Sequence, residues 1–561
     1  MRYIFVSGGV VSGLGKGVIS ASLGLLLKSA GFSVTNIKVD MYLNLDAGTI
    51  RPQEHGEVFV TADGLETDQD LGNYERFLNT SLRRENYLTT GQVYKSVIDR
   101  ERAFGYQGED VEAIPHVTDE IINRFKTAGE KNRADIVIVE LGGTVGEYQN
   151  ILFFEANRIL KLQNPDPVLH LHVSYLPVIK SLGELKSKPA QQSVRVLQGM
   201  GIQPDFLITR SEKEIDEKRK QKLALFCNLS KSSVISCPDV ADIYQVPELL
   251  AGQNLVKKIS KKLNLVPKKK LILLKHWISI NSKKHTHTKT INLCLVGKYF
   301  KTGNYTLKDS YVSVIEALNQ AASHQKININ YLFVNSEDRE VLKKNLKMAD
   351  GIIVPQGWGS RGIEGKIFAA SYARRHKIPY LGLCFGMQMA VIDFARHVCG
   401  LKKANSVEVN PTTPHPVIHI MPHQKEFLKK HQYGGTIRLG SYPCKIKKGS
   451  LLQKLYKKYS VSPTDPWFSD AKIISQKIKK NLIYERHRHR YEVNPKYLAK
   501  MQKRGLVISG ISPKGRLVEA IELHNHPFFL GTQFHPEYIA RPLMPHPIFM
   551  GFLKACNNGK I

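Results

Sequence analysis

The spacing of hydrophobic residues divides the chain into two stretches of alternating strands and helices. Short apolar runs separated by segments with helical periodicity occur from residue 1 to about 265. This alternation is typical of a largely parallel sheet covered by helices. The strands expected in this stretch are 3–6, 34–39, 135–140, 169–173, 205–208 and 234–236. The sequence therefore predicts an α/β domain over residues 1–265.

Residues 266–290 interrupt the pattern and are interpreted as a linker, because lysines follow Pro267 and a polar stretch precedes residue 290. A second alternation then covers 291–561, which we predict to be a second α/β domain. Its expected strands are 291–297, 327–334, 351–355 and 379–383. Within this domain, the lysine-rich and weakly patterned stretch 445–480 is interpreted as a surface insertion.

A glycine-rich loop, GGVVSGLGKG, occupies residues 8–17 between the first expected strand and the first helical pattern. In this position, backbone N–H groups and the helix N-terminus can bind phosphate. Because Gly17 rather than serine or threonine follows Lys16, the ligands of a magnesium ion must come from elsewhere. The alternative is that the glycines only allow close packing of the helix on the sheet.

Two charged residues at other strand ends favour the phosphate site. Lys38 lies near the end of strand 34–39, and Glu140 ends strand 135–140. Because ligands of open α/β sheets bind at the carboxyl ends of the strands, we expect both side chains to face the glycine loop.

The second domain contains a candidate nucleophile. Cys384 lies in PYLGLCFGMQ (379–388), where an expected strand runs into a G-x-C-x-G turn and a helix. His535 and Glu537 could supply a base and a carboxylate that orients it. The alternative is an inert buried cysteine. Taken together, the three residues resemble the triad of class I glutamine amidotransferases.

Composition limits the classes of function. The formal charge of +32 at pH 7 raises a nucleic-acid hypothesis. However, the lysines are spread over both domains, no nucleic-acid-binding motif occurs, and triphosphate substrates also favour a positive field. We expect no specific nucleic-acid partner. Seven cysteines without a C-x-x-C pair argue against disulfides and structural zinc. We also expect no membrane partner and a cytoplasmic protein, because neither a membrane-spanning run nor a signal peptide is found.

Several segments identify a more specific resemblance. Residues 40–44, 55–60 and 66–72, with the glycine loop and 140–146, closely resemble the CTP synthases, amidotransferases that convert UTP to CTP. The resemblance implies a P-loop-type synthetase domain followed by a class I glutamine amidotransferase domain. It also implies ATP, UTP and glutamine as substrates, Mg²⁺ as cofactor, GTP as allosteric activator, and a homotetramer, with filaments as a further form of assembly.

The resemblance implies roles for residues of the first domain. Asp70 and Glu140 would hold magnesium, and Lys16 and Lys38 would neutralise the charge of the transferring phosphate. Further implied ATP-binding residues are Gly13, Leu14, Gly15, Gly17, Val18 and Val240. The implied UTP- or CTP-binding residues are Ser12, Glu147, Tyr148, Gln149, Lys186, Ser187, Lys188, Pro189, Ala190, Gln191 and Lys222. We expect Lys186 and Lys188 to lie in an extended segment and to project to one side.

In the second domain, the residues implied in glutamine binding are Gly357, Phe385, Gly386, Met387, Gln388, Glu408 and Arg490. The N–H groups of Gly357 and Phe385 are candidate oxyanion donors. The chain departs from the family at Gln356, where the family has glycine, at Trp358, where it has another aromatic residue, and at 147–149, where it usually has Asp-Ile-Glu.

Two alternatives remain at this point. A cobyric-acid-synthase-like amidotransferase also joins a P-loop synthetase to a glutaminase, but segments 40–72 and 486–490 argue against it. A nucleotide-binding relative that has lost synthesis is the other. The presence of both magnesium carboxylates and of the complete Cys-His-Glu set argues against that alternative.

Overall fold

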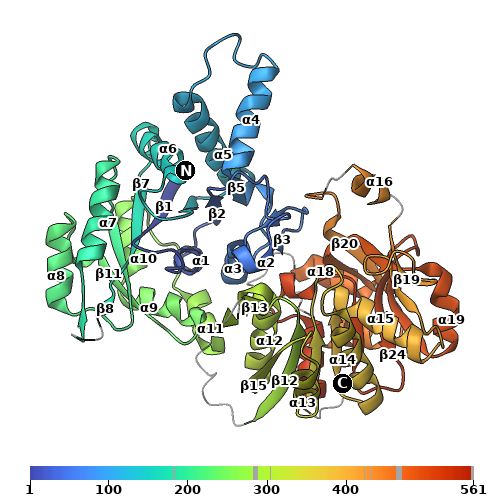
Figure 1. Ribbon diagram of the computed structural model, residues 1–561. Helices are drawn as coiled ribbons and strands as arrows, with labels where there is room; N and C mark the ends of the chain where they lie inside the picture. Colours follow the sequence, from blue (N-terminus) through green and yellow to red (C-terminus); the bar gives the residue numbers. More distant parts are fainter. Residues whose placement is uncertain are drawn as a thin grey trace. The chain divides into compact units, whose positions relative to one another are not determined.

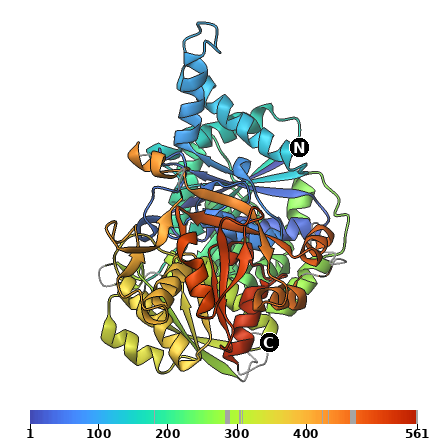
Figure 2. The ribbon, with the colours of Figure 1, turned by 90° about the vertical axis from the view of Figure 1, so that its right-hand side faces the viewer.

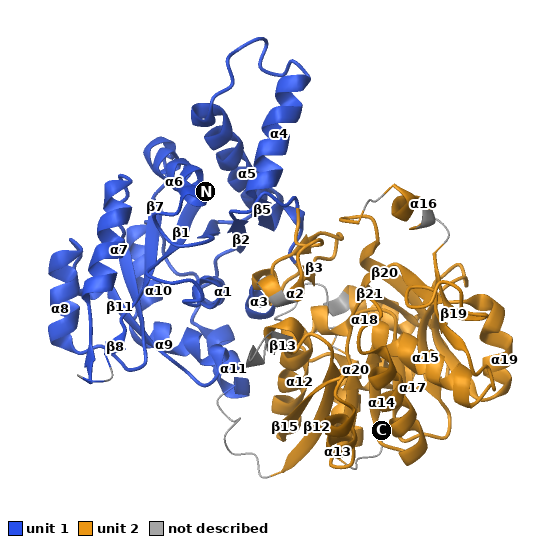
Figure 3. Ribbon diagram, in the orientation of Figure 1, with its two compact units in different colours: residues 1–45, 73–78, 82–282 blue, residues 46–72, 79–81, 283–561 orange. Residues whose placement is uncertain are grey.

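The computed structural model describes residues 1–179, 181, 183–281, 289–302, 305–306, 308–421, 424–430, 433–460, 462 and 471–557. It contains two compact units, which Figure 3 colours separately. The first comprises residues 1–45, 73–78 and 82–282, and the second comprises 46–72, 79–81 and 283–561. Residues 282–288 of the predicted linker lie outside the described residues.

The first unit is built on a seven-stranded parallel sheet in the order β11-β10-β7-β1-β6-β2-β5. Its strands are β1 (Arg2–Gly9), β2 (Val34–Asp40), β5 (Tyr87–Thr89), β6 (Ile136–Leu141), β7 (Val168–Tyr175), β10 (Phe206–Ser211) and β11 (Val234–Pro238). All strands predicted for this region are confirmed, and β5 was not predicted. A short hairpin of β8 (Val178–Ile179) and β9 (Glu184–Leu185) lies outside this sheet.

The alternation of side chains along β1 explains why the sheet is buried on both faces. Tyr3 and Phe5 belong to one hydrophobic core, and Ile4 and Val6 belong to another. Such strands are apolar without a polar face, as expected when helices cover both sides of a parallel sheet.

The helices of this unit are labelled in Figure 1: α1 (Lys16–Ser29), α3 (Asp70–Leu78, of which 73–78 belong here), α4 (Thr90–Arg102), α5 (Thr118–Lys131), α6 (Ile151–Gln163), α7 (Lys188–Gly199), α8 (Glu217–Phe226), α9 (Val246–Gly252), α10 (Leu255–Lys262) and α11 (Ile272–Asn281). Figures 1 and 2 show α4 and α5 extending away from the sheet as a helical hairpin. Within the predicted linker, α11 packs on this unit through Trp277, whose indole N–H donates to the carbonyl of Tyr244 at 2.9 Å.

The second unit contains a nine-stranded mixed sheet in the order β15-β12-β16-β17-β25-β24-β23-β20-β21. The parallel strands are β12 (Thr290–Gly297), β15 (Asn328–Asn335), β16 (Gly351–Val354), β17 (Tyr380–Leu383) and β25 (Phe529–Thr532). Every strand predicted here is confirmed. The antiparallel strands, which were not predicted, are β20 (Arg438–Ile446), β21 (Leu482–His489), β23 (Leu506–Ile511) and β24 (Val518–Leu523).

Its helices are α2 (Pro52–His55), α12 (Val312–Gln325), α13 (Arg339–Leu346), α14 (Ile363–His376), α15 (Phe385–His397), α16 (Gln424–Lys429), α17 (Leu451–Tyr459), α18 (Ala471–Lys479), α19 (Leu498–Lys503) and α20 (Pro547–Cys556). Smaller strands are β3 (Phe59–Val60) with β4 (Glu66–Thr67), β13 (Lys301–Thr302) with β14 (Tyr305–Thr306), and β18 (Ala404–Ser406) with β19 (His415–Ile420) and β22 (Tyr491–Val493).

The segment 46–72 packs on the second unit although its sequence neighbours belong to the first. The hydroxyl of Tyr538 donates to the carbonyl of Val58 at 2.9 Å, and the guanidinium of Arg486 donates to the carbonyl of Val60 at the same distance. The rings of Phe59 and Tyr538 meet edge to face. This segment is therefore part of the second unit's core.

The interpretation of 445–480 as a surface insertion is wrong for much of its length. Residues 445 and 446 end β20, and α17 follows, with Leu452 and Leu455 fully buried in the core that includes α20. The lysines of α17 occupy its solvent face, so the high charge concealed an amphipathic helix. Residues 461 and 463–470 lie outside the described residues. None of the described helices has the length and hydrophobicity needed to cross a membrane.

Candidate active sites

Cys384 occupies the strained turn between β17 and α15. Its backbone has φ 50° and ψ −98°, a conformation that costs a residue with a side chain about 1–3 kcal/mol and that clusters at functional sites. The N–H of Cys384 donates to the carbonyl of Thr532 on β25 at 2.6 Å. A Cβ at Gly386 would lie 1.9 Å from the carbonyl oxygen of Val354, so this position accepts only glycine. The turn expected from the sequence is present.

His535 and Glu537 form a buried pair just after β25. His535 Nδ1 and Glu537 Oε1 are 2.7 Å apart, and both side chains are about 1% exposed. Burial by itself lowers the pKa of the imidazole, but the charges of Glu537 and Cys384 outweigh it and raise the pKa of His535 to about 10. The carboxylate thus holds Nδ1 and leaves Nε2 for the thiol of Cys384. This arrangement suits a histidine that accepts the proton of a nucleophilic thiol.

A cavity opens in front of the thiol. It is lined by Gln356, Gly357, Trp358, Cys384, Phe385, Gln388, Glu408, Arg488, His489, Arg490, Tyr491 and His535. Two residues named as glutamine-binding do not line it, because Met387 packs in the hydrophobic core and Gly386 lies against β16. Gln533 was not predicted, and its amide Nε2 lies 3.5 Å from the Cys384 sulfur.

Glu408 and Arg490 are suited to the charged ends of an amino acid. Burial raises the pKa of Glu408, while its Oε1 accepts from the N–H of Gly359 at 2.6 Å. Arg490 is 4% exposed, and its Nη2 donates to the hydroxyl of Thr436 at 2.9 Å. Its Nη1 has no hydrogen-bond partner among the described residues. A carboxylate entering the cavity could accept from this group, and an ammonium group could donate to Glu408.

Segment 46–72 supplies two partners of the cavity residues that sequence reasoning missed. Gln356 Nε2 donates to Glu57 Oε1 at 2.7 Å, and Arg488 Nε donates to Glu66 Oε1 at 2.8 Å. Glu66 is 2% exposed, and a buried carboxylate needs an opposite charge nearby, which the guanidinium of Arg488 provides. No local signal in the sequence could reveal contacts across such chain separations.

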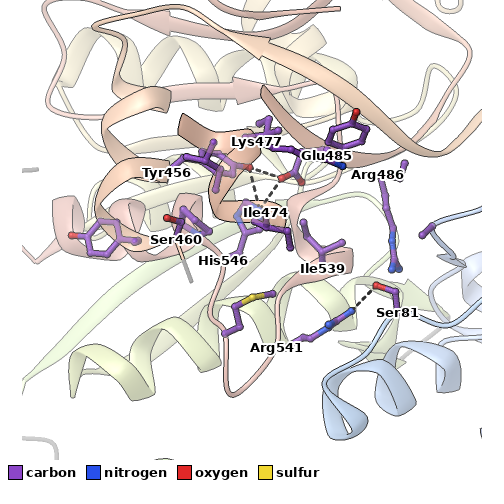
Figure 4. A pocket seen from close by; sticks show the side chains of 18 of the residues that line it. Ser81, Tyr456, Ser460, Ile474, Lys477, Glu485, Arg486, Ile539, Arg541 and His546 are labelled. Atoms are coloured by element: carbon purple, nitrogen blue, oxygen red, sulfur yellow. Dashed lines mark hydrogen bonds and ion pairs between the residues drawn. The ribbon is translucent and has the colours of Figure 1, made fainter. Parts of the chain in front are cut away.

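A second cavity, shown in Figure 4, lies beside β21 and shares no lining residue with the first. At its wall, Glu485 accepts from the hydroxyl of Tyr456 at 2.5 Å and is 3.2 Å from His546 Nε2. On another side of this cavity, Arg541 donates to the hydroxyl of Ser81 at 3.0 Å. Glu485 belongs to β21, the strand that also carries Arg488 of the first cavity.

In the first unit, the glycine loop joins β1 to α1. Gly13 and Gly15 have φ 72° and 83°, a left-handed conformation that glycine adopts without steric cost. Because the N-cap residue Gly15 has no side chain, it leaves the first N–H groups of α1 available to a phosphate. Of the other predicted ATP residues, Gly17 lies in the first turn of α1, Leu14 is buried, and Val18 and Val240 pack against the same core.

Lys16 and the segment after β6 meet at this loop. Lys16 Nζ donates to the carbonyl of Gly143 at 2.5 Å, and the N–H of Val145 donates to the carbonyl of Gly8 at 2.8 Å. The exposed Ser12 lies in the loop itself. The structure therefore brings the segment that follows β6 into contact with the glycine loop.

Lys38 and Glu140 pair directly across neighbouring strands. They are register partners on β2 and β6, and Lys38 Nζ lies 3.1 Å from Glu140 Oε1. Lys38 is also 3.8 Å from Asp40, and the hydroxyl of Tyr74 donates to the other oxygen of Glu140. A lysine and two carboxylates thus lie at the carboxyl ends of two central strands.

Asp70 begins α3 and accompanies the second unit, whereas Glu140 belongs to the first. A joint magnesium site of these two residues therefore stays a prediction. The described residues contain no group of three or more His, Cys, Asp and Glu side chains placed to hold a metal ion. One or two carboxylates suffice for magnesium when phosphates and waters complete its shell, so the oxygen donors of this site suit that ion.

Apart from Ser12 of the glycine loop, the predicted pyrimidine-nucleotide residues lie near α6, at the start of α7 and on α8. Tyr148 and Gln149 line a cavity of about 440 Å³ with residues 41–43 and side chains of α4, α5 and α6. Glu147 does not line it, because its Oε1 accepts from the N–H and hydroxyl of Thr144 at 2.7 and 2.6 Å. Of the three residues 147–149, Tyr148 and Gln149 can therefore contact a ligand in this cavity directly.

The residues predicted to bind the triphosphate lie around the start of α7, except Lys222. The extended segment predicted for Lys186 and Lys188 is wrong, because Ser187 has helical dihedrals and Lys188 begins α7. The proline after it suits this first turn. Ala190 is buried, and Gln191 Nε2 donates to the Ser187 hydroxyl at 3.0 Å. Lys186 pairs with Glu184 at 2.8 Å, whereas Lys222 is exposed on α8.

Two family models match the chain. The one described as CTP synthase N-terminus matches residues 2–265, and the one described as glutamine amidotransferase class-I matches residues 306–555. The CTP synthase of Caldanaerobacter subterraneus subsp. tengcongensis is 49% identical over 564 residues, covering 100% of this chain and 99% of the relative. The CTP synthase of Methanococcus maripaludis is 49% identical over 566 residues, covering 99% of each chain.

A solved structure of the Trypanosoma brucei CTPS glutaminase domain with bound acivicin is 35% identical, with a TM-score of 0.41, and covers 48% of this chain and 95% of its own. The sequence matches extend over both units described above. On the evidence of the full-length relatives and the two family models, this chain is a member of the CTP synthase family.

Proposed function

We propose that this protein catalyses the ATP-dependent amination of UTP to CTP with ammonia released from glutamine. The observation that carries the proposal is the buried set of Cys384, His535 and Glu537 at a cavity in the second unit. The same chain carries the glycine loop and the Lys38–Glu140 pair in its first unit. A glutaminase joined to a phosphate site is what the amination of a phosphorylated carbonyl requires.

Glutamine binding would use two charged residues that line the cavity. Glu408 would accept from the α-ammonium group, and Arg490 would donate to the α-carboxylate. This binding would place the side-chain amide at Cys384. Because both charged groups on the α-carbon would be held, the side-chain amide carbon would have a defined position in front of the thiol.

The thiolate of Cys384 would attack the amide carbon, and the N–H groups of Gly357 and Phe385 would stabilise the resulting oxyanion. The imidazolium of His535 would give its proton to the departing nitrogen, so ammonia leaves and a thioester forms. The neutral His535 would then take a proton from a water molecule whose oxygen adds to the thioester carbon. The C–S bond breaks, glutamate leaves, and the thiolate of Cys384 and the imidazolium of His535 are restored. Glu537 would stabilise the imidazolium throughout.

In the first unit, O4 of UTP would receive the γ-phosphoryl group of ATP, and ammonia would displace phosphate from C4. Lys16 and Lys38 would neutralise charge on the transferring group. Asp70 and Glu140 would hold Mg²⁺, which when bound supplies further charge neutralisation to the phosphates. The remaining ATP contacts would come from Gly13, Leu14, Gly15, Gly17, Val18 and Val240.

The UTP triphosphate would lie near the start of α7, and CTP would overlap it as a feedback inhibitor. The residues proposed for these nucleotides are Ser12, Glu147, Tyr148, Gln149, Lys186, Ser187, Lys188, Pro189, Ala190, Gln191 and Lys222. GTP activation, a homotetramer or filament, and a cytoplasmic location are also proposed, and their support is the family resemblance.

Nitrogen transfer tests this function. The purified chain would be incubated with UTP, ATP, Mg²⁺ and glutamine labelled with ¹⁵N in its side-chain amide, and CTP would be analysed by mass spectrometry. The proposal requires CTP carrying the label at N4, with glutamate, ADP and phosphate formed in equal amounts. Unlabelled CTP, or glutamate without CTP, would contradict it. Omitting ATP provides the control.

A further inference from the structure

Two buried lysines that the proposed reaction does not use lie beside the loop 355–359. Lys298 follows β12 and is 2% exposed, and Lys366 lies in α14 and is 0% exposed. An ammonium group is costly to bury unless hydrogen bonds compensate it. Burial lowers the pKa of both groups, that of Lys298 to about 8. The structure must therefore compensate two buried amino groups beside a loop that lines the Cys384 cavity.

The compensation comes from backbone carbonyls of the loop itself. The acceptors are the carbonyl oxygens of Pro355 (from Lys366, 2.8 Å), Gln356 (from Lys366, 3.3 Å), Gly359 (from Lys298, 2.9 Å) and Trp358 (from Lys298). These residues flank Gly357 on both sides. Because the two ammonium groups belong to different elements, β12 and α14 both restrain the same short loop.

The lysines also determine where the loop's N–H groups point. In a trans peptide the C=O of one residue and the N–H of the next point in opposite directions. Lys366 holds the C=O of Gln356, so the N–H of Gly357 is directed away from Lys366. Gly357 lines the Cys384 cavity, and its N–H has no acceptor among the described residues.

In the two peptides that follow Gly357, the N–H groups already donate to other side chains. Lys298 holds the C=O of Trp358, and the N–H of Gly359 on the other side of that peptide donates to Glu408 at 2.6 Å. The N–H of Trp358 donates to the hydroxyl of Tyr299 at 3.0 Å. The loop thus leaves the N–H of Gly357 for a ligand in the cavity.

We propose that Lys298 and Lys366 are positioning residues that hold loop 355–359 so that the N–H of Gly357 donates to the oxyanion formed from glutamine. Their ammonium groups lie 5.3 and 5.4 Å from the ring centroid of Phe385, whose own N–H is the second donor. The two ammonium groups thus contact the loop that carries one proposed donor and the side chain of the residue that carries the other. The inference rests on the proposed role of Cys384.

The test compares Lys298→Met and Lys366→Met with Lys343→Met, which alters an exposed lysine of α13. Loss of one oxyanion donor lowers kcat by about 100- to 1,000-fold. A displaced loop would weaken the donor without removing it, so kcat should fall by less. We expect kcat for glutamate release to fall about 10- to 100-fold, with KM changed less than about threefold. Lys298→Gln, which keeps N–H donors, should retain more activity than Lys298→Met.

Alkylation of Cys384 by iodoacetamide separates positioning from loss of structure, because this reaction forms no oxyanion. The lysine variants should be alkylated within about twofold of the wild-type rate and should keep ammonia-dependent synthesis. Equal losses of alkylation and hydrolysis, or a change in KM alone, would overturn the inference. So would normal kcat in both methionine variants. A wild-type protein without glutaminase activity would instead contradict the proposed function, and Cys384→Ala sets that baseline.

Discussion

Replacing Glu537 with glutamine tests how much of the glutaminase rate depends on the charge behind His535. The substitution keeps the shape and an acceptor for Nδ1, whose present distance to the carboxylate is 2.7 Å. A hydrogen bond to a charged group contributes about 1.5–3 kcal/mol against about 1 kcal/mol for a neutral one. The imidazolium therefore loses about 0.5–2 kcal/mol of stabilisation. At about 1.4 kcal/mol per tenfold, kcat should fall about 2- to 30-fold.

The same substitution should change the pH dependence. The pKa of His535 is raised to about 10, in part by Glu537, so the imidazolium persists through neutral pH. Without the carboxylate the pKa falls toward its ordinary value of about 6.5, and the imidazolium is lost at lower pH. Activity in Glu537→Gln should decline on the alkaline side well before that of the wild type.

The assay is glutamate release at saturating glutamine over a range of pH, with Glu340→Gln, an exposed carboxylate of α13, as the matched control. Ammonia-dependent CTP formation should be unchanged in Glu537→Gln, which shows that the fold is intact. An unaltered kcat together with an unaltered alkaline limb would refute the assigned role of Glu537.

Three further predictions concern other parts of the molecule. Glu140→Gln should remove CTP synthesis from either nitrogen source, because the partner of Lys38 and a proposed magnesium ligand loses its charge; normal ammonia-dependent synthesis would argue against both roles. Gln149→Glu should tighten CTP inhibition several-fold at matched UTP saturation, because a charged acceptor exceeds a neutral amide by about 1 kcal/mol; equal inhibition constants would count against this. The raised pKa of His535 predicts that this residue's contribution to the free energy of unfolding is fully present below about pH 6.5 and is lost as the pH rises to about 10. The Tm difference between wild type and His535→Asn should therefore narrow over that interval. A constant Tm difference would exclude this linkage.

Hydrophobic spacing predicted the parallel strands other than β5 and β25, because they are buried on both faces and their sequences are apolar runs. It failed for the antiparallel part of the second sheet. In β21, Glu485, Arg486 and His487 are all 1% exposed or less, because each has buried partners. A strand whose charged side chains face the interior has no hydropathy signal, so tertiary pairing, rather than local pattern, explains this miss.

The candidate site shows the same division. The Cys384 turn and the pair of His535 with Glu537 were predictable because each depends on residues close together in the sequence. The contacts of Glu57 with Gln356 and of Glu66 with Arg488 were not, because these partners are 299 and 422 positions apart in the sequence. Lys298 and Lys366 were missed for a related reason: nothing in their local sequence shows that they are buried.

The central claim is that one chain makes ammonia at Cys384 and uses it in a separate synthase site. The most direct measurement is CTP formation by Cys384→Ala with glutamine and, in parallel, with ammonium as nitrogen source. The account predicts that glutamine-dependent synthesis falls to background while ammonium-dependent synthesis stays close to that of the wild type. Loss of both activities in a folded variant, or continued synthesis from glutamine, would contradict it.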